Sequence, residues 1–190
     1  MKVPEKFVKP IDRACERFAI TGKRKAAFLA HFAVETAGFT KFQENLNYTT
    51  PERILQVFPS KVKSLVAAKM LTRNPKALAN VVYANRLGNG PSTSNEGWLY
   101  SGKGGFQLTG KNNYVEAEKA LGYPYVAYPE LLLEPEHAAL TAAWYWFKSG
   151  CNEAIDRGDF RSTTRRINGP AQLHTEERLA LFNDFSETLA

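Results

Sequence analysis

The sequence predicts a mainly α fold in which a helical body carries a small inserted helical lobe. Apolar residues recur three and four positions apart over most of the chain, and no internal repeat interrupts this pattern. A chain of 190 residues can bury about 70% of the surface that it exposes when unfolded. With 44% hydrophobic and 23% charged residues, the composition excludes disordered, collagen-like and disulfide-scaffold classes.

The first half of the chain is predicted to form short helices. The apolar spacing places them over residues 11–20, 23–37, 50–58, 62–71 and 75–83. Gly38 ends the second of these helices. Thr50 and Pro51 supply an N-cap and a first-turn proline for the third helix, and Pro59 ends it.

Glycine and turn-forming residues are dense from residue 86 to residue 109, which predicts a shaped loop region or a short hairpin. Two further helices are predicted beyond this region. The helix over 134–147 is apolar nearly all round and should be central and buried. The last helix, over 175–189, should pack Leu179, Phe182 and Phe185 inward.

The positive charge of the chain is concentrated in one window. Lys and Arg (25) exceed Asp and Glu (19) by 6, which favours an anionic partner. Residues 61–110 alone hold seven basic residues against the single acid Glu96. We therefore predict a basic lobe over 49–94, inserted into a body formed by 1–48 and 95–190. The alternative is that these lysines are the solvated faces of short helices.

The sequence does not support several other classes of protein. The window of positive charge carries no nucleic-acid-reading motif, so no nucleic-acid partner is expected. The chain start lacks the apolar stretch of a signal peptide, and no run of apolar residues is long enough for stable membrane insertion. Cys15 and Cys151 are read as buried thiols, and the three histidines lack metal-ligand spacing, so neither a metal nor a cofactor is expected.

Glu35 is the strongest candidate for chemistry. Phe28, His31 and Phe32 precede it on one helical face, and it lies in the last helical turn. Apolar walls and the negative helix end both disfavour a charged carboxylate, as a general acid requires. Glu44, nine residues on in a polar segment, should stay ionised, and two carboxyl groups in different environments are typical of glycosidases. The alternative for Glu44 is an ordinary solvated side chain.

Aromatic residues are interleaved with glycine and asparagine in the loop region. They are Trp98, Tyr100, Phe106 and Tyr114. Such a mixture is typical of a sugar-binding cleft, where rings stack on pyranose faces and amides bind hydroxyl and N-acetyl groups. Aromatic packing within the loop itself is the open alternative.

Five segments together resemble glycoside hydrolase family 19, the chitinase-like group that includes many phage endolysins. The segments are GWLYSGKGGFQLTGKNNY (97–114), AVETAGF around Glu35, QENLNYT around Glu44, NVVYANRLGNG (80–90) and ING (167–169). The resemblance covers roughly residues 25–182 and implies a lysozyme-like or chitinase-like helical body.

The resemblance also implies a role for individual residues. Glu35 would be the general acid and Glu44 the general base, and Thr109 would help to hold the attacking water. Sugar-binding positions match Gln107, Asn113 and Asn168, and Trp98 and Tyr100 would shape the cleft. Arg178 would support the catalytic glutamate. The chain departs from many relatives at Val34, Ser101 and Lys103, where those relatives carry His or Arg.

These observations predict a peptidoglycan-degrading endolysin that hydrolyses β-1,4 bonds between N-acetyl sugars with inversion. It would act as a monomer, be made in the host cytoplasm and reach the wall in the periplasm through a separate pore protein, the holin. The nearest alternative is a chitinase acting on chitin with the same catalytic pair. A second alternative is a non-catalytic glycan-binding protein, which the two retained glutamates disfavour.

Overall fold

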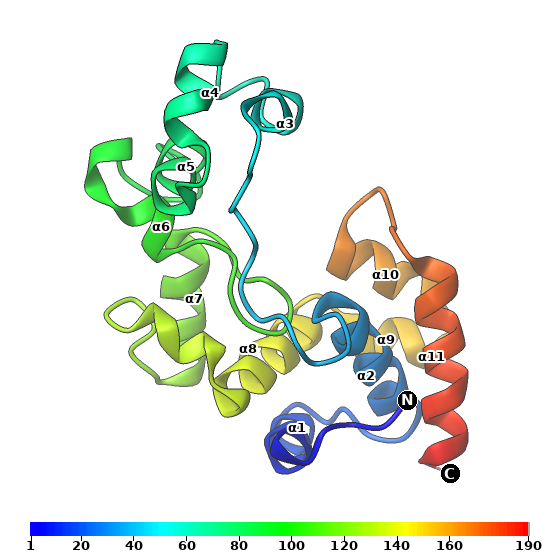
Figure 1. Ribbon diagram of the computed structural model, residues 1–190. Coiled ribbons are helices and arrows are strands. Elements are labelled where there is room, and N and C mark those ends of the chain that lie inside the picture. Colours follow the sequence, from blue (N-terminus) through cyan, green and yellow to red (C-terminus); the bar gives the residue numbers. More distant parts are fainter. Residues whose placement is uncertain (190) are drawn as a thin grey trace. The chain divides into compact units, whose positions relative to one another are not determined.

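The computed structural model describes residues 1–189 as helices joined by loops, without a strand in that range (Figure 1). The chain divides into two compact units. The first unit comprises residues 1–42, 104–107 and 130 onward, and the second comprises 43–103 and 108–129. The prediction of a mainly α fold is confirmed.

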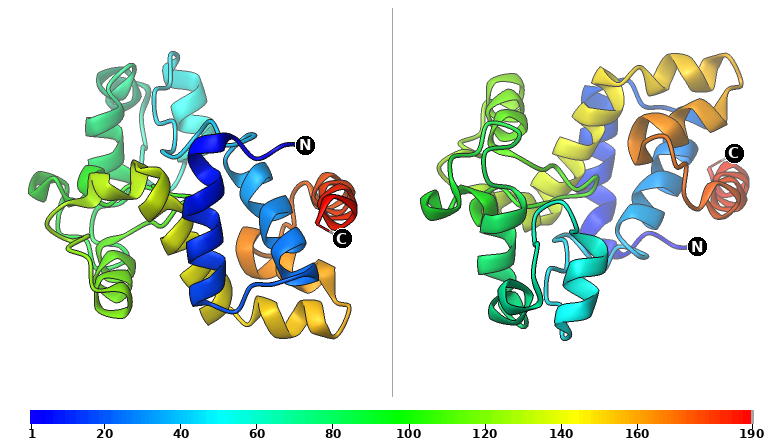
Figure 2. Two further views of the ribbon diagram at one scale, coloured as in Figure 1. Left: turned by 90° about the horizontal axis from the view of Figure 1, so that it is seen from below. Right: turned by 90° about the horizontal axis from the view of Figure 1, so that it is seen from above.

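The first unit is built around one central helix, α2. Its helices are α1 (Glu5–Arg17), α2 (Lys23–Glu35), α8 (Pro135–Lys148), α9 (Cys151–Asp156), α10 (Phe160–Asn168) and α11 (Thr175–Thr188). Figure 2 shows α11 beside α2 and α1 beside α8, and α2 also contacts α8, α9 and α10. Every residue of α2 from 26 to 33 is buried, which fits a helix covered on all sides.

Aromatic rings fill the core of the first unit. Phe28 of α2 meets Trp146 of α8 edge to face, with ring centroids 5.8 Å apart, and Phe7 of α1 stacks on Phe42 at 4.9 Å. The predicted inward packing of the last helix is also confirmed: Phe185 is buried, and Leu179 and Phe182 pack against the same core. Each fully buried Phe contributes about 1.5–3 kcal/mol.

The second unit consists of shorter helices around a smaller core. They are α3 (Pro51–Val57), α4 (Leu65–Leu71), α5 (Pro75–Val82), the 3₁₀ helix η1 (Ser92–Ser94), α6 (Glu96–Leu99) and α7 (Lys111–Leu121). A further 3₁₀ helix, η2 (Pro129–Leu133), belongs to the first unit except for Pro129. The core contains Ile54, Leu78 and Val82. Asn74 caps α5 by accepting a hydrogen bond from the backbone N–H of Ala77 at 3.1 Å.

Some helices begin elsewhere than the sequence predicts or were missed. α1 begins at Glu5 rather than near residue 11, because Pro10 lies inside the helix instead of preceding it. The short helices α6, α7, α9 and α10 carry polar residues on much of their surface, which weakened their apolar periodicity. In place of a hairpin, Lys103 forms isolated antiparallel bridges with Gln43 and Leu108.

The second unit extends beyond the lobe predicted for residues 49–94. It includes 95–103 and α7 because side chains tie these segments to each other. The rings of Tyr100 and Tyr114 lie 5.2 Å apart, and the Tyr114 hydroxyl donates to the Ser101 carbonyl at 2.9 Å. Lys111 of α7 forms an ion pair with Glu96 of α6 at 2.5 Å.

Both cysteines are free and buried, as predicted. Burial raises the pKa of the Cys15 thiol and of the Cys151 thiol to about 12, so both remain protonated thiols at neutral pH. Among residues 1–189, no helix is both long and apolar enough to cross a bilayer.

Candidate active site

Glu35 is the last residue of α2, and its side chain is 17% exposed. Nη2 of Arg178, from α11, donates a hydrogen bond to the Glu35 carboxylate at 2.6 Å. The Arg178 side chain is 1% exposed, and its Nε also donates to the Leu173 carbonyl at 3.2 Å. A buried guanidinium therefore holds the Glu35 carboxylate, as the resemblance implied for Arg178, and the expected apolar wall does not describe this contact.

Asn168 connects to the same group of residues. It ends α10, and its side-chain oxygen accepts a hydrogen bond from the backbone N–H of Leu173 at 2.7 Å. Since the Leu173 carbonyl accepts from Arg178, one residue of the loop joins the Asn168 amide to the guanidinium that holds Glu35. The first unit thus brings three predicted site residues, Glu35, Asn168 and Arg178, into one network.

His31 lies one turn before Glu35 and is fully buried. Its Nδ1 lies 2.9 Å from the Ala27 carbonyl, which only accepts, so Nδ1 carries the proton. Nε2 lies 3.3 Å from the Thr164 hydroxyl of α10. Burial, with a smaller effect of the Arg178 charge, lowers the pKa of His31 to about 3, so the ring is neutral. It joins α2 to α10.

Glu44 belongs to the second unit, where both carboxylate oxygens are held. The Gly102 backbone N–H donates to Oε1 at 2.5 Å, and the Tyr83 hydroxyl donates to Oε2 at 2.7 Å. The Glu44 backbone N–H in turn donates to the Gly102 carbonyl at 3.0 Å. Glu44 is half-buried and held on both oxygens, so the alternative of an ordinary solvated glutamate does not describe it.

Tyr83 is a site residue that the sequence analysis missed. Burial and the Glu44 charge both raise the pKa of Tyr83, so its hydroxyl stays protonated and donates to the carboxylate. The signal was present in the segment 80–90, which matched the family motif without any role being assigned to its tyrosine.

The loop that follows Gly102 places the other polar residues of the motif. Gln107 has a left-handed backbone (φ 50°) and its amide donates to the Gly104 carbonyl at 3.4 Å in the first unit. In the second unit, the Asn113 side chain donates to the Thr109 carbonyl at 2.6 Å. Gly105 requires its glycine, because an added Cβ would lie 2.2 Å from the Phe32 ring.

The aromatic residues of the loop region differ in exposure. Tyr100 and Tyr114 are buried, and the Tyr100 hydroxyl donates to the Val126 carbonyl at 3.1 Å. For these two residues the structure supports loop packing and contradicts sugar stacking, because neither ring face is open. Trp98 is half-buried against the core of the second unit.

Lys103, one of the seven basic residues counted in the window 61–110, does not lie on the surface. Its side chain is fully buried, and its ammonium donates to the Leu99 carbonyl at 2.9 Å and to the Ser101 hydroxyl at 3.2 Å. The other six basic residues of the window 61–110 are half-buried or exposed. Lys103 therefore supports the loop from inside.

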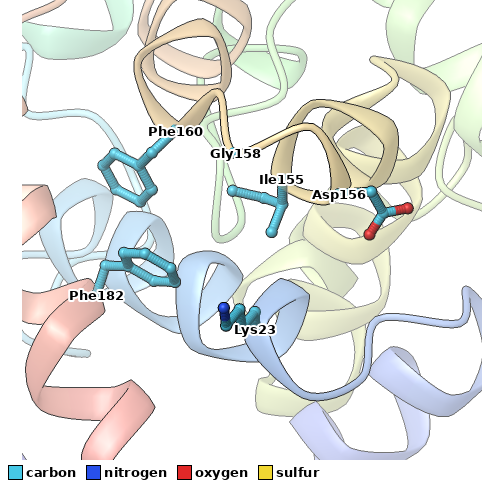
Figure 3. Close-up of a pocket in the computed structure, with 6 residues that line it drawn as sticks. All are labelled: Lys23, Ile155, Asp156, Gly158, Phe160 and Phe182. Carbon is cyan, nitrogen blue, oxygen red and sulfur yellow. The ribbon is translucent and has the colours of Figure 1, made fainter.

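The first unit also contains a cavity of about 440 Å³ that is separate from Glu35 (Figure 3). Its lining residues are Lys23, Ile155, Asp156, Gly158, Phe160 and Phe182. Lys23 begins α2 and Glu35 ends it, so the two ends lie about 18 Å apart along the helix. None of the predicted site residues lines this cavity. Within residues 1–189, no cluster of three or more His, Cys, Asp or Glu side chains is placed to hold a metal ion.

The fold is that of the family 19 chitinases. The structure of chitinase C from Streptomyces griseus matches 98% of this chain and 70% of its own, with a TM-score of 0.61 and 25% identity. A second bacterial family 19 chitinase matches 96% of this chain and 86% of its own, with a TM-score of 0.62 and 22% identity.

Curated relatives extend this likeness to the sequence. A glycosyl hydrolase family 19 domain-containing protein of Haemophilus influenzae is 40% identical over 153 residues, which cover 77% of this chain and 70% of that protein. An endochitinase of Arabidopsis thaliana is 31% identical over 64% of this chain, which spans about half of the plant protein. No family model matches the chain. The chain belongs to glycoside hydrolase family 19, and it is a glycoside hydrolase.

Proposed function

We propose that this glycoside hydrolase is an endolysin that cleaves β-1,4 bonds between the N-acetyl sugars of peptidoglycan, with inversion, during phage-mediated lysis. The catalytic roles are supported by one observation: other residues of the protein donate hydrogen bonds to each of the two motif glutamates. Arg178 holds Glu35 and the pair Tyr83 and Gly102 holds Glu44. Carboxylates fixed before substrate binds are what proton transfer at two defined atoms requires.

Glu35 acts in this proposal as the general acid that protonates the leaving glycosidic oxygen. One of its oxygens receives the Arg178 hydrogen bond, so the guanidinium fixes the orientation of the carboxyl group. Asn168 steadies the Leu173 segment that also binds Arg178. In its own right, Asn168 is proposed to bind a polar group of the sugar.

Glu44 acts as the general base that removes a proton from the attacking water. Each carboxylate oxygen accepts one hydrogen bond, from Gly102 or from Tyr83, and keeps a further lone pair for that water. Thr109 is proposed to hold the same water. Inversion requires about 6.5–9.5 Å between the two carboxyl groups, so the proposal demands this spacing when substrate is bound.

Substrate binding falls in this proposal to polar side chains of the glycine-rich loop and of α7. Gln107 and Asn113 would bind hydroxyl and N-acetyl groups, and Trp98 would shape the cleft. Tyr100 contributes by packing the loop, as its burial indicates. The Asn113 amide already fixes the backbone of Thr109, which supports a joint role for these two residues.

Peptidoglycan is favoured as the substrate by charge. The chain carries a net charge of +6, and this excess lies mainly in the second unit, whereas the peptides of the wall carry carboxylates. The proposal includes a monomer made in the host cytoplasm that acts in the periplasm, with passage through a separate holin. The absence of a nucleic-acid partner stays a prediction.

Glutamine substitutions test the catalytic assignments. We expect Glu35→Gln to lower kcat by at least about 100-fold while the protein remains folded, given the usual worth of proton transfer. Its melting temperature should fall, because the amide offers no negative charge to the buried Arg178 guanidinium. Glu44→Gln should be impaired as severely, and azide should rescue it by forming a glycosyl azide of inverted configuration. Glu116→Gln, at an exposed glutamate of the second unit, serves as the matched control. Near-normal turnover by either catalytic variant would overturn the assignment of that residue.

A chitinase is the second candidate, favoured by the names of similar proteins: the plant relative is an endochitinase and the structural neighbours are chitinases. Chitin is neutral, and the same catalytic pair would cleave it. Comparing turnover of chitin oligosaccharides with turnover of peptidoglycan separates the two substrates. A glycan-binding protein without catalysis would keep its function in the Glu35→Gln variant.

A further inference from the structure

Helix α4 exposes apolar side chains on its outward face. Val66 is 72% exposed, Met70 is 76% exposed and Leu65 is 42% exposed. Val66 and Met70 are four residues apart and therefore lie one above the other on the same side of the helix. Three neighbouring exposed apolar side chains on seven helical residues require an explanation that single exposed side chains do not.

The inward face of α4 shows that this exposure is not a packing defect. Ala68 and Leu71 are buried in the core of the second unit together with Val62. Ser64 caps the helix by accepting from the Ala67 backbone N–H at 3.2 Å, so the helix is fixed at its start. The buried residues fix the rotation of α4, and this rotation directs Val66 and Met70 to solvent.

Exposed cationic residues lie close to these apolar side chains along the chain. Lys63 and Lys69 are exposed, as are Arg73 and Lys76 just beyond the helix. Residues 53–95 contain seven basic residues and no acidic residue, so this span offers no carboxylate to neutralise them. We call Lys63, Leu65, Val66, Lys69, Met70 and Arg73 the α4 patch. Figure 1 shows α3 and α4 at one end of the second unit and α7 at the other, and Figure 2 agrees.

We propose that the α4 patch docks this protein on an anionic phospholipid surface. Lysine and arginine side chains reach lipid phosphates while their methylene stems lie on apolar surface, and exposed Val, Leu and Met enter the boundary between headgroups and acyl chains. A polyanionic wall polymer would use the charges and would gain nothing from Val66 or Met70 in water. The combination of both kinds of side chain therefore favours lipid over a glycan.

The proposal is independent of the catalytic assignment, because no residue of the α4 patch is proposed to act in catalysis or to contact the sugar. Lys63 and Lys69 also belong to the lysines proposed to attract the anionic wall, whereas Val66 and Met70 do not. Docking would be peripheral, since only one face of a two-turn helix takes part. It would also be salt-sensitive, because phospholipid attraction of cationic residues falls off within a Debye length.

Vesicle sedimentation tests the proposal on the full chain. We expect binding to vesicles of phosphatidylglycerol and phosphatidylethanolamine, and at least tenfold weaker binding to pure phosphatidylcholine vesicles. Val66→Ser/Met70→Ser and Lys63→Gln/Lys69→Gln should each weaken binding to the anionic vesicles at least fivefold. Met70→Trp should strengthen it, so that the test does not depend on losses alone. Melting temperatures establish that each variant is folded.

A matched control lies on α1, where Val8 is 41% exposed between two exposed lysines. The variant Lys6→Gln/Val8→Ser/Lys9→Gln removes equal charge there and should bind vesicles as the wild type does. The proposal fails if this control is weakened as much as the α4 variants, if wild type ignores anionic vesicles, or if only the lysine substitutions matter. The last result would identify a purely electrostatic surface suited to the anionic wall.

Discussion

Glu35 and Glu44 are held by chemically different partners. Arg178 and the network through Leu173 to Asn168 fix Glu35, whereas a phenol and a backbone amide fix Glu44. Neutral donors on both Glu44 oxygens stabilise a carboxylate without a neighbouring cation. A base that must take a proton from water requires such an ionised group.

Tyr83→Phe should lower kcat about tenfold and leave KM nearly unchanged. The substitution keeps the ring and removes only the hydroxyl that lies 2.7 Å from Glu44. A hydrogen bond to a charged group contributes about 1.5–3 kcal/mol, of which about 1.4 kcal/mol corresponds to a tenfold change in rate. Steady-state kinetics on glycan measure the effect. Tyr128→Phe, at an exposed tyrosine of the same unit, should leave kcat unaltered; equal effects of both would refute the role of Tyr83.

Arg178→Lys should lower kcat at least tenfold and reduce the free energy of unfolding by about 1–3 kcal/mol. Lysine lacks the fork that donates both to Glu35 and to the Leu173 carbonyl, so one buried acceptor loses its partner. Urea unfolding and kinetics measure the two effects. Arg161→Lys is the control, because the Arg161–Glu176 pair is exposed and should cost under about 0.5 kcal/mol. A normal kcat in Arg178→Lys would count against positioning.

At the scale of elements, the sequence anticipated what periodicity and capping govern and missed what depends on tertiary contacts. The start of α2 at Lys23 was predicted, although the helix ends at Glu35, two residues before the predicted end, and Pro75 marks the start of α5. Glu35 could be singled out from its own helix, whereas Glu44 and Arg178 needed the resemblance to a family. The sequence did not predict the role of Tyr83, because its partner, Glu44, lies 39 residues away along the chain.

His31 should make stability depend on pH, because α2 and α10 enclose it in neutral form. The folded pKa of His31, about 3, lies below the ordinary 6.5, so the unfolded chain binds more protons between these values. The contribution of His31 to stability is therefore complete above about pH 6.5 and is lost as the pH falls toward 3. Within this window, titration of His31 changes the free energy of unfolding by at most about 1.4 kcal/mol per pH unit.

The test compares urea unfolding between pH 4 and 7 for wild type and His31→Asn, which keeps a donor for the Ala27 carbonyl. On acidification, the free energy of unfolding of the variant should fall less steeply than that of wild type. The reason is that unfolding of the variant takes up fewer protons, by up to about one per molecule. His174→Asn, at an exposed histidine of α11's start, is the control. An identical pH slope in wild type and His31→Asn would show that His31 does not titrate on unfolding.

At the level of the whole molecule, the sequence predicted the distribution of charge better than the division into two units. Periodicity did not predict that 95–103 and α7 join the second unit, since the Tyr100–Tyr114 contact and the Lys111–Glu96 pair are tertiary. The charge asymmetry was visible in the sequence. It places the net excess of +6 mainly in the second unit, with Lys103 buried rather than displayed.

Peptidoglycan digestion should therefore weaken as salt is raised, while cleavage of neutral chitin oligosaccharides should not. Raising ionic strength from about 0.01 M to 0.1 M shortens the Debye length from about 30 Å to about 10 Å. Substituting Lys61, Lys63 and Lys69 with Gln should remove much of this dependence and lower wall binding mainly at low salt. If the triple variant binds the wall as tightly as wild type at every salt concentration, these lysines serve solubility and not wall binding.

Digestion of purified Gram-negative peptidoglycan by wild type and by Glu35→Gln, followed by mass spectrometry of the new reducing ends, tests both the substrate and the role of Glu35. We predict that wild type releases muropeptides with one kind of sugar at the reducing end and that Glu35→Gln releases almost none. Equal release by both proteins would contradict the assignment of Glu35. No release by wild type, with cleavage of chitin oligosaccharides, would contradict the endolysin proposal and favour a chitinase.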